Sequence, residues 1–282
     1  MRTLFYFVLL LFCTSCASNL GPAGIGTGLT PSMIPDPDAV IAQASVEVSG
    51  FQGSTYNIDD QNLGGMVRLE MMRGLGFGGK DTPQRKVSLY NTTFLRLGGG
   101  NYQLRNDRYR DFAGNYGYFS WAGGGGLGAM THLGAKWYLD VGGQVQLGTE
   151  TGKWPRVGSS TEELLDGQVI AETPPSGIFV LVASDSPVYT VADYALHGRL
   201  IVPLGERAKL AMGYQHQWTG RALGRIRLGA INIGVTLNEW EVFGQHFTAL
   251  NTPARRELQG GFSFGVRRRF DFDVQLSSIL SR

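Results

Sequence analysis

The sequence predicts an all-β chain that folds as a transmembrane up-and-down antiparallel β-barrel of about ten strands, with twelve as the alternative count. The first observation is the segment 135–148, in which alternate residues are apolar and the residues between them are mostly polar. The apolar set is Trp137, Leu139, Val141, Gly143, Val145 and Leu147, and the opposite set is Tyr138, Asp140, Gly142, Gln144 and Gln146. A period of two belongs to a β-strand, and this length matches the roughly nine to eleven residues that cross a bilayer at a tilt.

The composition is the second observation. The chain has 282 residues, of which 41 are glycine and 17% are charged, and its formal net charge is +2. Many glycines and few charges are typical of sheets and turns, and a net charge near zero gives no reason to expect a nucleic-acid partner. The mean hydropathy of −0.07 excludes a helical membrane protein, but it fits barrel strands, in which only alternate residues are apolar.

The N-terminus carries a targeting segment that is not part of the fold. Arg2 precedes the apolar run 4–12, and Thr14-Ser15-Cys16 follows it. This arrangement resembles the signal of bacterial lipoproteins, in which a cysteine after a small residue is lipidated and becomes the mature N-terminus. The resemblance covers the first sixteen residues and departs from the pattern at Cys13, where leucine is usual.

The resemblance implies a signal peptide over 1–15, a lipidated Cys16, and transfer to the outer membrane because Ala17 follows instead of aspartate. We expect 16–38, which is rich in glycine and proline, to be a flexible lipid-anchored tether. The alternative is an ordinary signal peptide cut near Ala17-Ser18, which leaves no lipid. In both cases Cys13 is removed, so the mature chain has no internal disulfide.

Ten alternating segments follow in the barrel region 39–282. We expect strands at 40–51, 66–77, 86–98, 115–130, 135–148, 191–204, 209–218, 225–237, 240–247 and 258–280. The connections after the second, fourth, sixth and eighth strands are short, and most of the others are longer and more polar. Because barrels of the outer membrane have short periplasmic turns and longer outer loops, both chain ends are predicted to be periplasmic.

Two further stretches have specific interpretations. Four consecutive glycines, Gly123 to Gly126, lack the helix and lysine of a phosphate-binding loop, so we interpret them as places where the wall bends and bulky neighbours pack. The longest interruption is the extracellular loop 149–189, whose segments 168–172 and 178–183 form a hairpin above the membrane or two further wall strands. We expect this loop to contact other envelope proteins, while outer-membrane lipid surrounds the barrel.

The register opposite the apolar one predicts the lining of the lumen. The expected lumen-facing residues are Glu47, Arg68, Glu70, Arg96, Asp140, Gln144, Asp193, Arg199, Arg225, Arg227, Asp271 and Asp273. Charges of both signs occur in similar number, so we expect them to pair across a filled interior. The alternative is a narrow aqueous pore whose ion preference these charges set.

No catalytic residue, cofactor or metal site is predicted. His216 and His246 fall in the lipid-facing register, as members of an interfacial aromatic belt, while His197 shares a face with Asp193 and Arg199. The leading hypothesis is a lipid-anchored outer-membrane barrel with a structural, adhesive or assembly-related role, or one that forms a narrow pore. The alternative is an outer-membrane hydrolase of proteins or lipids, which requires His197 or His246 to face a serine or aspartate.

Overall fold

The computed structural model describes residues 29–35, 42–54, 61–75, 87–104, 114–134, 137–153, 188–219, 226–251 and 260–272. These residues form ten strands: β1 (Ala42–Ser54), β2 (Gln61–Leu75), β3 (Val87–Leu104), β4 (Gly114–Gly134), β5 (Trp137–Gly152), β6 (Val188–Pro203), β7 (Ala208–Thr219), β8 (Ile226–Leu237), β9 (Trp240–Asn251) and β10 (Gly260–Phe272). Within the described ranges, no helix is long and apolar enough to cross a membrane.

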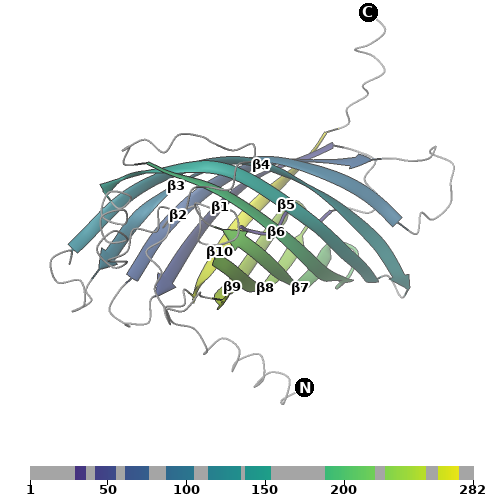
Figure 1. The fold of residues 1–282 in the computed structure, drawn as a ribbon. Helices are drawn as coiled ribbons and strands as arrows, with labels where there is room; N and C mark the ends of the chain where they lie inside the picture. Colours follow the sequence, from purple (N-terminus) through teal and green to yellow (C-terminus); the bar gives the residue numbers. More distant parts are fainter. Residues whose placement is uncertain are drawn as a thin grey trace, which may run out of the picture.

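The ten strands form one closed barrel (Figure 1). Each strand pairs antiparallel with the next, and β10 closes the barrel on β1 in a register that joins Ala42 to Phe272 and Ser54 to Gly260. Closure leaves no strand edge unpaired. A sheet in hydrocarbon requires this, because its backbone N–H and C=O groups find no other hydrogen-bond partners there. The predicted ten-stranded up-and-down barrel is confirmed, and the segments 168–172 and 178–183 lie outside the described residues.

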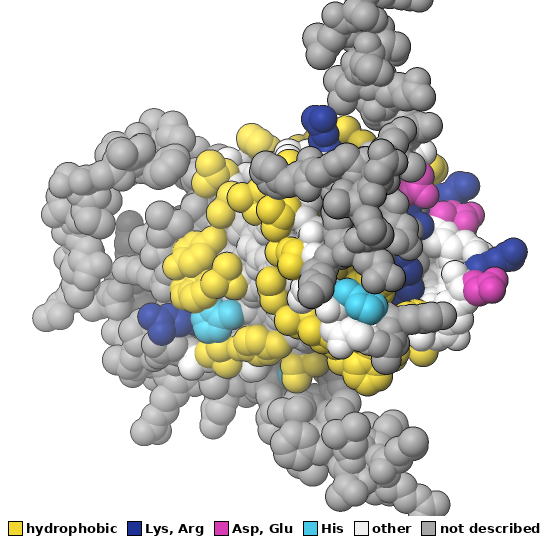
Figure 2. Space-filling model, turned by 90° about the vertical axis from the view of Figure 1, so that its right-hand side faces the viewer, with side chains coloured by type: hydrophobic (Ala, Val, Ile, Leu, Met, Phe, Trp, Pro, Cys, Tyr) yellow, Lys and Arg dark blue, Asp and Glu magenta, His cyan; other side chains and the backbone are white. Residues whose placement is uncertain are grey.

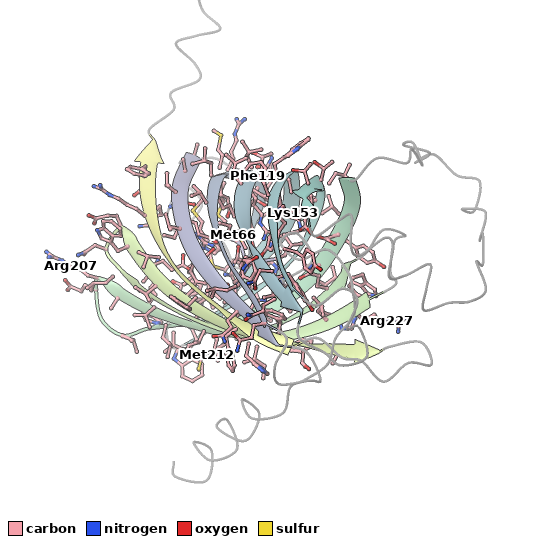
Figure 3. The ribbon with its side chains drawn as sticks, turned by 90° about the vertical axis from the view of Figure 1, so that its left-hand side faces the viewer. Met66, Phe119, Lys153, Arg207, Met212 and Arg227 are labelled. Carbon is pink, nitrogen blue, oxygen red and sulfur yellow. The ribbon has the colours of Figure 1, made fainter. Side chains whose placement is uncertain are left out.

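The two ends of the barrel carry different connections. At one end, which we call the short-turn end, residues 135–136 join β4 to β5, residues 204–207 join β6 to β7 and residues 238–239 join β8 to β9. Asn238 adopts a φ of 53° there, a left-handed conformation that asparagine tolerates. The connection after β2 lies at the same end and was predicted to be short, but it takes residues 76–86. The opposite end, which we call the loop end, carries the ends of β5 and β6 that flank the long loop. Arg207 and Arg227 mark the short-turn end and the loop end in Figure 3.

The outer face of the barrel is apolar and exposed, whereas the inner face is polar and buried. Val145 and Phe264 are 61% and 68% exposed, while Glu47 and Asp140 have no exposed surface. Apolar side chains form several patches on the described part of the face in Figure 2, and Phe119 and Met212, which are both exposed, are labelled in Figure 3. Because exposure of such a surface to water costs about 25 cal/mol per Å² of apolar area, the barrel is built to span a bilayer.

The glycines of β4 make room for aromatic rings inside the barrel. A Cβ on Gly128 would lie 2.1 Å from Tyr90 Cζ, and one on Gly124 would lie 2.5 Å from Phe94 Cζ. Tyr90 and Phe94 are the β3 residues directly opposite these two glycines. The structure therefore agrees with the interpretation that bulky neighbours pack over the glycine run.

Candidate functional site

Residues 29–35, which we call the lumen segment, lie inside the barrel, and all of them are buried. The sequence interpretation assigned them to the flexible tether 16–38. Their glycine- and proline-rich surroundings favour flexibility in solution, but the wall of the barrel supplies partners that an isolated tether would lack. The tether description therefore does not hold for this described part of 16–38.

Wall side chains bind mainly the backbone of the lumen segment. The Leu29 amide donates to Gln217 Oε1 at 2.7 Å, and the Leu29 carbonyl accepts from Gln215 Nε2 at 2.7 Å. At the other end, the Ile34 amide donates to Glu241 Oε2 at 3.4 Å. Arginines donate to the carbonyls between them, those of Thr30, Pro31, Ser32 and Met33. Every residue has these main-chain groups, so the wall recognises an extended backbone more than a particular sequence.

The apolar side chains of the lumen segment fill gaps between the wall residues. They join three small clusters: Leu29 with Phe94 and Ala195, Met33 with Met72 and Tyr90, and Ile34 with Met130, Ile201 and Ala211. Burial of one such side chain contributes about 1.5–3 kcal/mol relative to its exposure. Polar contacts to the backbone of residues 29–34 and apolar contacts to three of their side chains therefore hold the lumen segment in place.

Arg68 of β2 joins the lumen segment to two strands. Its Nη1 donates to the Thr30 carbonyl at 2.8 Å and to the Thr30 hydroxyl at 3.0 Å. Its Nη2 donates to Gln144 Oε1 at 3.1 Å and lies 2.9 Å from the Glu70 carboxylate. The guanidinium also lies 4.0 Å from the centre of the Phe94 ring. A buried cation needs this degree of compensation because water cannot solvate it.

Arg267 of β10 holds two carboxylates and one carbonyl. Its Nη2 lies 2.6 Å from Glu47 Oε2, and its Nη1 lies 3.0 Å from Glu241 Oε2. Nη2 also donates to the Pro31 carbonyl at 2.8 Å. Arg267 therefore links β1, β9 and the lumen segment through one planar guanidinium, whose several donors point in fixed directions.

Arg199 of β6 is the centre of a third group. It donates to Asp140 Oδ2 from Nε at 2.9 Å and from Nη2 at 2.5 Å, and to the Ser32 carbonyl from Nη1 at 2.6 Å. The Tyr90 hydroxyl donates to the second oxygen of Asp140 at 2.6 Å. His197 Nε2 lies 3.4 Å from Asp140 Oδ2. Asp140 is thus the common acceptor for three wall side chains.

His197 facing Asp140 is the geometry that the hydrolase hypothesis required, but the surroundings do not suit catalysis. Arg199 and Tyr90 already occupy both oxygens of Asp140, and His197 is 6% exposed. The hydrogen bonds described for His197 include no serine hydroxyl, and the described ranges contain no cluster of His, Cys, Asp or Glu that could hold a metal ion. The arrangement supports a role of His197 in the buried ion network.

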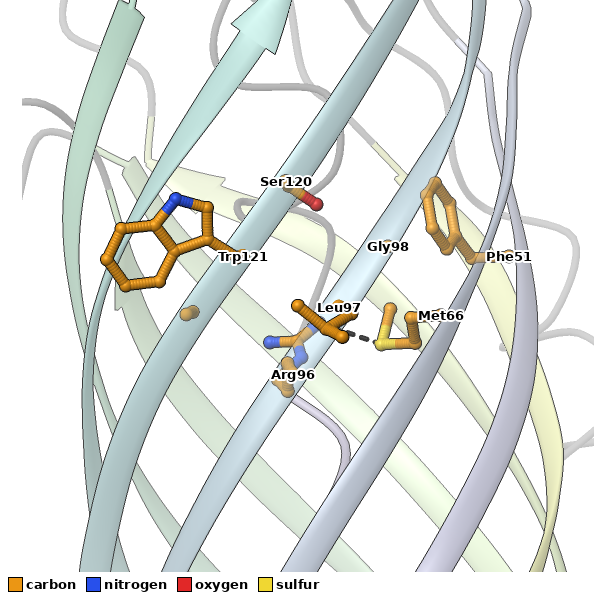
Figure 4. A pocket seen from close by; sticks show the side chains of 8 residues that line it. Phe51, Met66, Arg96, Leu97, Gly98, Ser120 and Trp121 are labelled. Carbon is orange, nitrogen blue, oxygen red and sulfur yellow. Dashed lines mark hydrogen bonds between the residues drawn. The ribbon is translucent and has the colours of Figure 1, made fainter.

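Arg96 belongs to a smaller polar group on the wall. It donates to Gln146 Oε1 at 2.9 Å, and Gln146 donates to Asp193 Oδ2 at 2.5 Å. Its second nitrogen lies 2.9 Å from the sulfur of Met66, as the dashed line in Figure 4 shows. Arg96 and Met66 border a recess, together with Phe51 and Trp121, whose volume of about 10 Å³ is barely enough for one water molecule. Ligand pockets usually have about 300–1,000 Å³, so the recess is a poor candidate for a binding site.

The structure places eight of the twelve predicted lumen residues in the buried interior. They are Glu47, Arg68, Glu70, Arg96, Asp140, Gln144, Asp193 and Arg199. Asp271 lies opposite the inward-facing Gln43 at the short-turn end, where its side chain is 52% exposed and pairs with Arg269. Arg225 and Asp273 lie outside the described residues.

Arg227 was predicted to face the lumen, and this prediction is wrong because Arg227 is exposed on the outer face. The prediction required a register switch at Gly229-Ala230, but β8 pairs with β7 without a break from Ile226 to Leu237. The irregularity lies in the pairing with β9, between Arg227 and Leu228. The inward row therefore begins at Leu228, which is 2% exposed.

His216 and His246 lie among aromatic residues of the outward register. The His216 ring is 4.2 Å from the Trp218 ring, which stacks on Tyr194 at 4.6 Å. The His246 ring is 4.7 Å from that of Phe262. Such clusters are typical of the aromatic belt at a membrane interface.

Arg267 and the lumen segment, two central parts of the site, were not predicted from the sequence. Arg267 is the first of three consecutive arginines, so polarity alone does not show which of them faces the lumen. Alternation would have shown it, because Phe264 and Val266 face outward and Arg267 is in the opposite register. The lumen segment has no period of two, so no pattern in the sequence could have shown that it lies inside the barrel.

No protein-family model and no curated protein matches the chain. Solved structures with a similar fold include an outer-membrane channel from Pseudomonas putida F1, at 12% identity and a TM-score of 0.40, covering 87% of this chain and 100% of that chain. They also include the β domain of the Bordetella autotransporter Brka, at 13% identity and a TM-score of 0.42, covering 81% and 99%. These likenesses concern the fold alone. The closed sheet, apolar exterior and polar interior give the chain the architecture of an outer-membrane β-barrel.

Proposed function

We propose that the chain is a lipid-anchored outer-membrane β-barrel whose lumen is closed by its own N-terminal segment. Its role is structural, adhesive or assembly-related, and the loop end presents the contact surface. The observation that carries this proposal is the set of hydrogen bonds between wall side chains and the backbone of residues 29–34. An open pore needs a continuous water path, whereas here the charges that would line such a path bind the lumen segment and one another.

The contact surface in this proposal is the loop 149–189. Its described ends, up to Lys153 and from Val188, lie at the loop end. In outer-membrane barrels the longer loops face outward, so a partner in the envelope or outside the cell would meet this end. The interior of that loop, 154–187, lies outside the described residues.

Conductance measurements test the closed lumen. The purified full-length protein in a planar lipid bilayer is expected to show no steady current steps, because the lumen segment occupies the path. Deletion of residues 29–35 is expected to produce steady steps, since the remaining wall is polar. Deletion of residues 18–24, which has the same length, is the matched control and is expected to stay closed. Steady ohmic steps from the full-length protein would contradict the proposal.

The lipid anchor on Cys16 is a separate part of the proposal and rests on the Thr14-Ser15-Cys16 motif. Mass spectrometry of the N-terminal peptide is expected to show acyl chains on Cys16 as the first residue. An unmodified N-terminus at Ala17 or Ser18 would exclude the anchor without affecting the evidence for the barrel.

A further inference from the structure

The C-terminal part of the lumen segment lies at the short-turn end. Ile34 packs against Ile201 and Ala211, which flank the turn 204–207, and it also packs against Met130 near the end of β4. Its amide donates to Glu241, two residues beyond the turn 238–239. Both Ala42, where β1 begins, and Phe272, where β10 ends, lie at this same end. Ile34 and Ala42, on the two sides of the connection to β1, therefore both lie at the short-turn end.

The N-terminal part of the lumen segment lies farther toward the loop end. The Leu29 amide binds Gln217, two residues before β7 ends at Thr219 on the loop side. The Leu29 side chain packs against Phe94 and Ala195, which lie near the middle of β3 and β6. The chain direction from Leu29 to Ile34 is therefore from the loop side to the short-turn side.

The lumen segment is enclosed on all sides, which leaves no width for a second pass of the chain. It is contacted by side chains from eight strands: β1, β2, β3, β4, β6, β7, β9 and β10. A second extended chain beside it would need a further spacing of about 4.7–4.9 Å. The wall side chains that hydrogen-bond to the lumen segment already occupy that space.

We propose that the chain before Leu29 leaves the barrel through the loop end, so that the mature N-terminus lies on the outer surface of the cell. The short turns of such barrels are periplasmic, which makes the loop end the outer side. Leu29 follows Cys16 by thirteen positions, and thirteen extended residues span up to about 45 Å. That reach exceeds half of an apolar band about 25 Å tall, so acyl chains on Cys16 reach the outer leaflet.

This proposal rests on the lumen segment of the proposed function, and it replaces the periplasmic N-terminus that loop lengths alone predicted. The closed lumen and the outward N-terminus are separable. A segment that closes the lumen could in principle be preceded by residues on either side of the membrane, and only the chain direction and the crowded interior select the outer side.

Cysteine labelling with a membrane-impermeant maleimide tests the direction. The variant Ser18→Cys is compared in intact and permeabilised cells with Lys153→Cys, an exposed residue of the loop end, and with Glu206→Cys, an exposed residue of the short-turn end. The unmodified chain, labelled in parallel, measures any reaction of Cys16 itself. We expect Ser18→Cys to be labelled in intact cells to about the same extent as Lys153→Cys, and Glu206→Cys to be labelled only after permeabilisation.

Two results would overturn the outward N-terminus. Labelling of Ser18→Cys that follows Glu206→Cys would place the N-terminus in the periplasm, and labelling only after the barrel is unfolded would place it within the lumen. The conductance of the same variants separates the two proposals. A barrel that does not conduct but whose Ser18→Cys is labelled from the periplasm would contradict only the outward N-terminus. A barrel that conducts would contradict both the closed lumen and the outward N-terminus.

Discussion

Val145 and Gln144 are neighbours on β5, but they meet opposite surroundings. Val145 is exposed on the apolar exterior, whereas Gln144 is buried and accepts a hydrogen bond from Arg68 at 3.1 Å. Contact with lipid is non-directional, so many apolar side chains satisfy the outer position. The inner position depends on one donor at one distance. The outer face of the barrel is therefore specified by composition and the inner face by individual partners.

The largest expected effect comes from removing a central cation. Arg267→Leu leaves Glu47 and Glu241 buried without their shared partner, and breaking a buried ion pair in this way costs about 3–5 kcal/mol. The free energy of unfolding, measured by guanidinium titration in lipid vesicles, is expected to fall by this amount.

The adjacent residue provides the matched control. Arg268 is exposed on the outer face, where its guanidinium lies 5.3 Å from the centre of the Trp240 ring. Arg268→Ala is expected to cost only about 0.5–1 kcal/mol, the usual contribution of an exposed cation–π contact. Equal losses for Arg267→Leu and Arg268→Ala would show that the two faces do not differ as described.

A charge on the outer face is the next largest expected effect. Val145→Arg places a cation against lipid, which costs about 2–4 kcal/mol near the middle of the membrane. The yield of barrel inserted into vesicles is expected to fall accordingly, while Val145→Leu is expected to leave it unchanged. Normal insertion of Val145→Arg would indicate that protein or water, and not lipid, covers this face.

Much of the fold could be predicted because a two-residue period follows directly from strand geometry. Leu139 to Leu147 have the alternation that the structure shows, and eight predicted inward residues are buried. Uninterrupted alternation with the outward Ile231 and Ile233 also places Arg227 on the outer face. Its predicted inward direction was wrong because it required a register switch at Gly229-Ala230, which β8 does not make in its pairing with β7.

The partners inside the lumen were not predictable. By alternation alone, Gln144 is an inward polar residue that an arginine could replace, whereas the structure places it beside Arg68, so that Gln144→Arg would bring two cations together. The lumen segment lies far from its partners in sequence, since Arg267 binds a carbonyl 236 positions away. Local periodicity carries no information about such contacts.

The smallest expected effect compares two glycines of β4 that lie on opposite faces. A Cβ on Gly128 would lie 2.1 Å from Tyr90 Cζ, and Tyr90 cannot move freely because its hydroxyl binds Asp140 at 2.6 Å and its ring packs against Met33. Overpacking of this kind typically costs about 1–3 kcal/mol, so Gly128→Ala is expected to lower the free energy of unfolding by that amount.

Gly123 lies on the outward register of the same strand, and its nearest neighbour to an added Cβ is the Phe94 carbonyl oxygen at 4.0 Å. Gly123→Ala is therefore expected to be neutral or to stabilise by up to about 1 kcal/mol, because alanine restricts the unfolded chain more than glycine does. Both variants add one methyl group to the same strand, so guanidinium titration of the two compares an inward with an outward position directly. If Gly128→Ala were as stable as Gly123→Ala, the Tyr90 ring would have space to move, and the interior would be looser than a lumen closed by residues 29–35 requires.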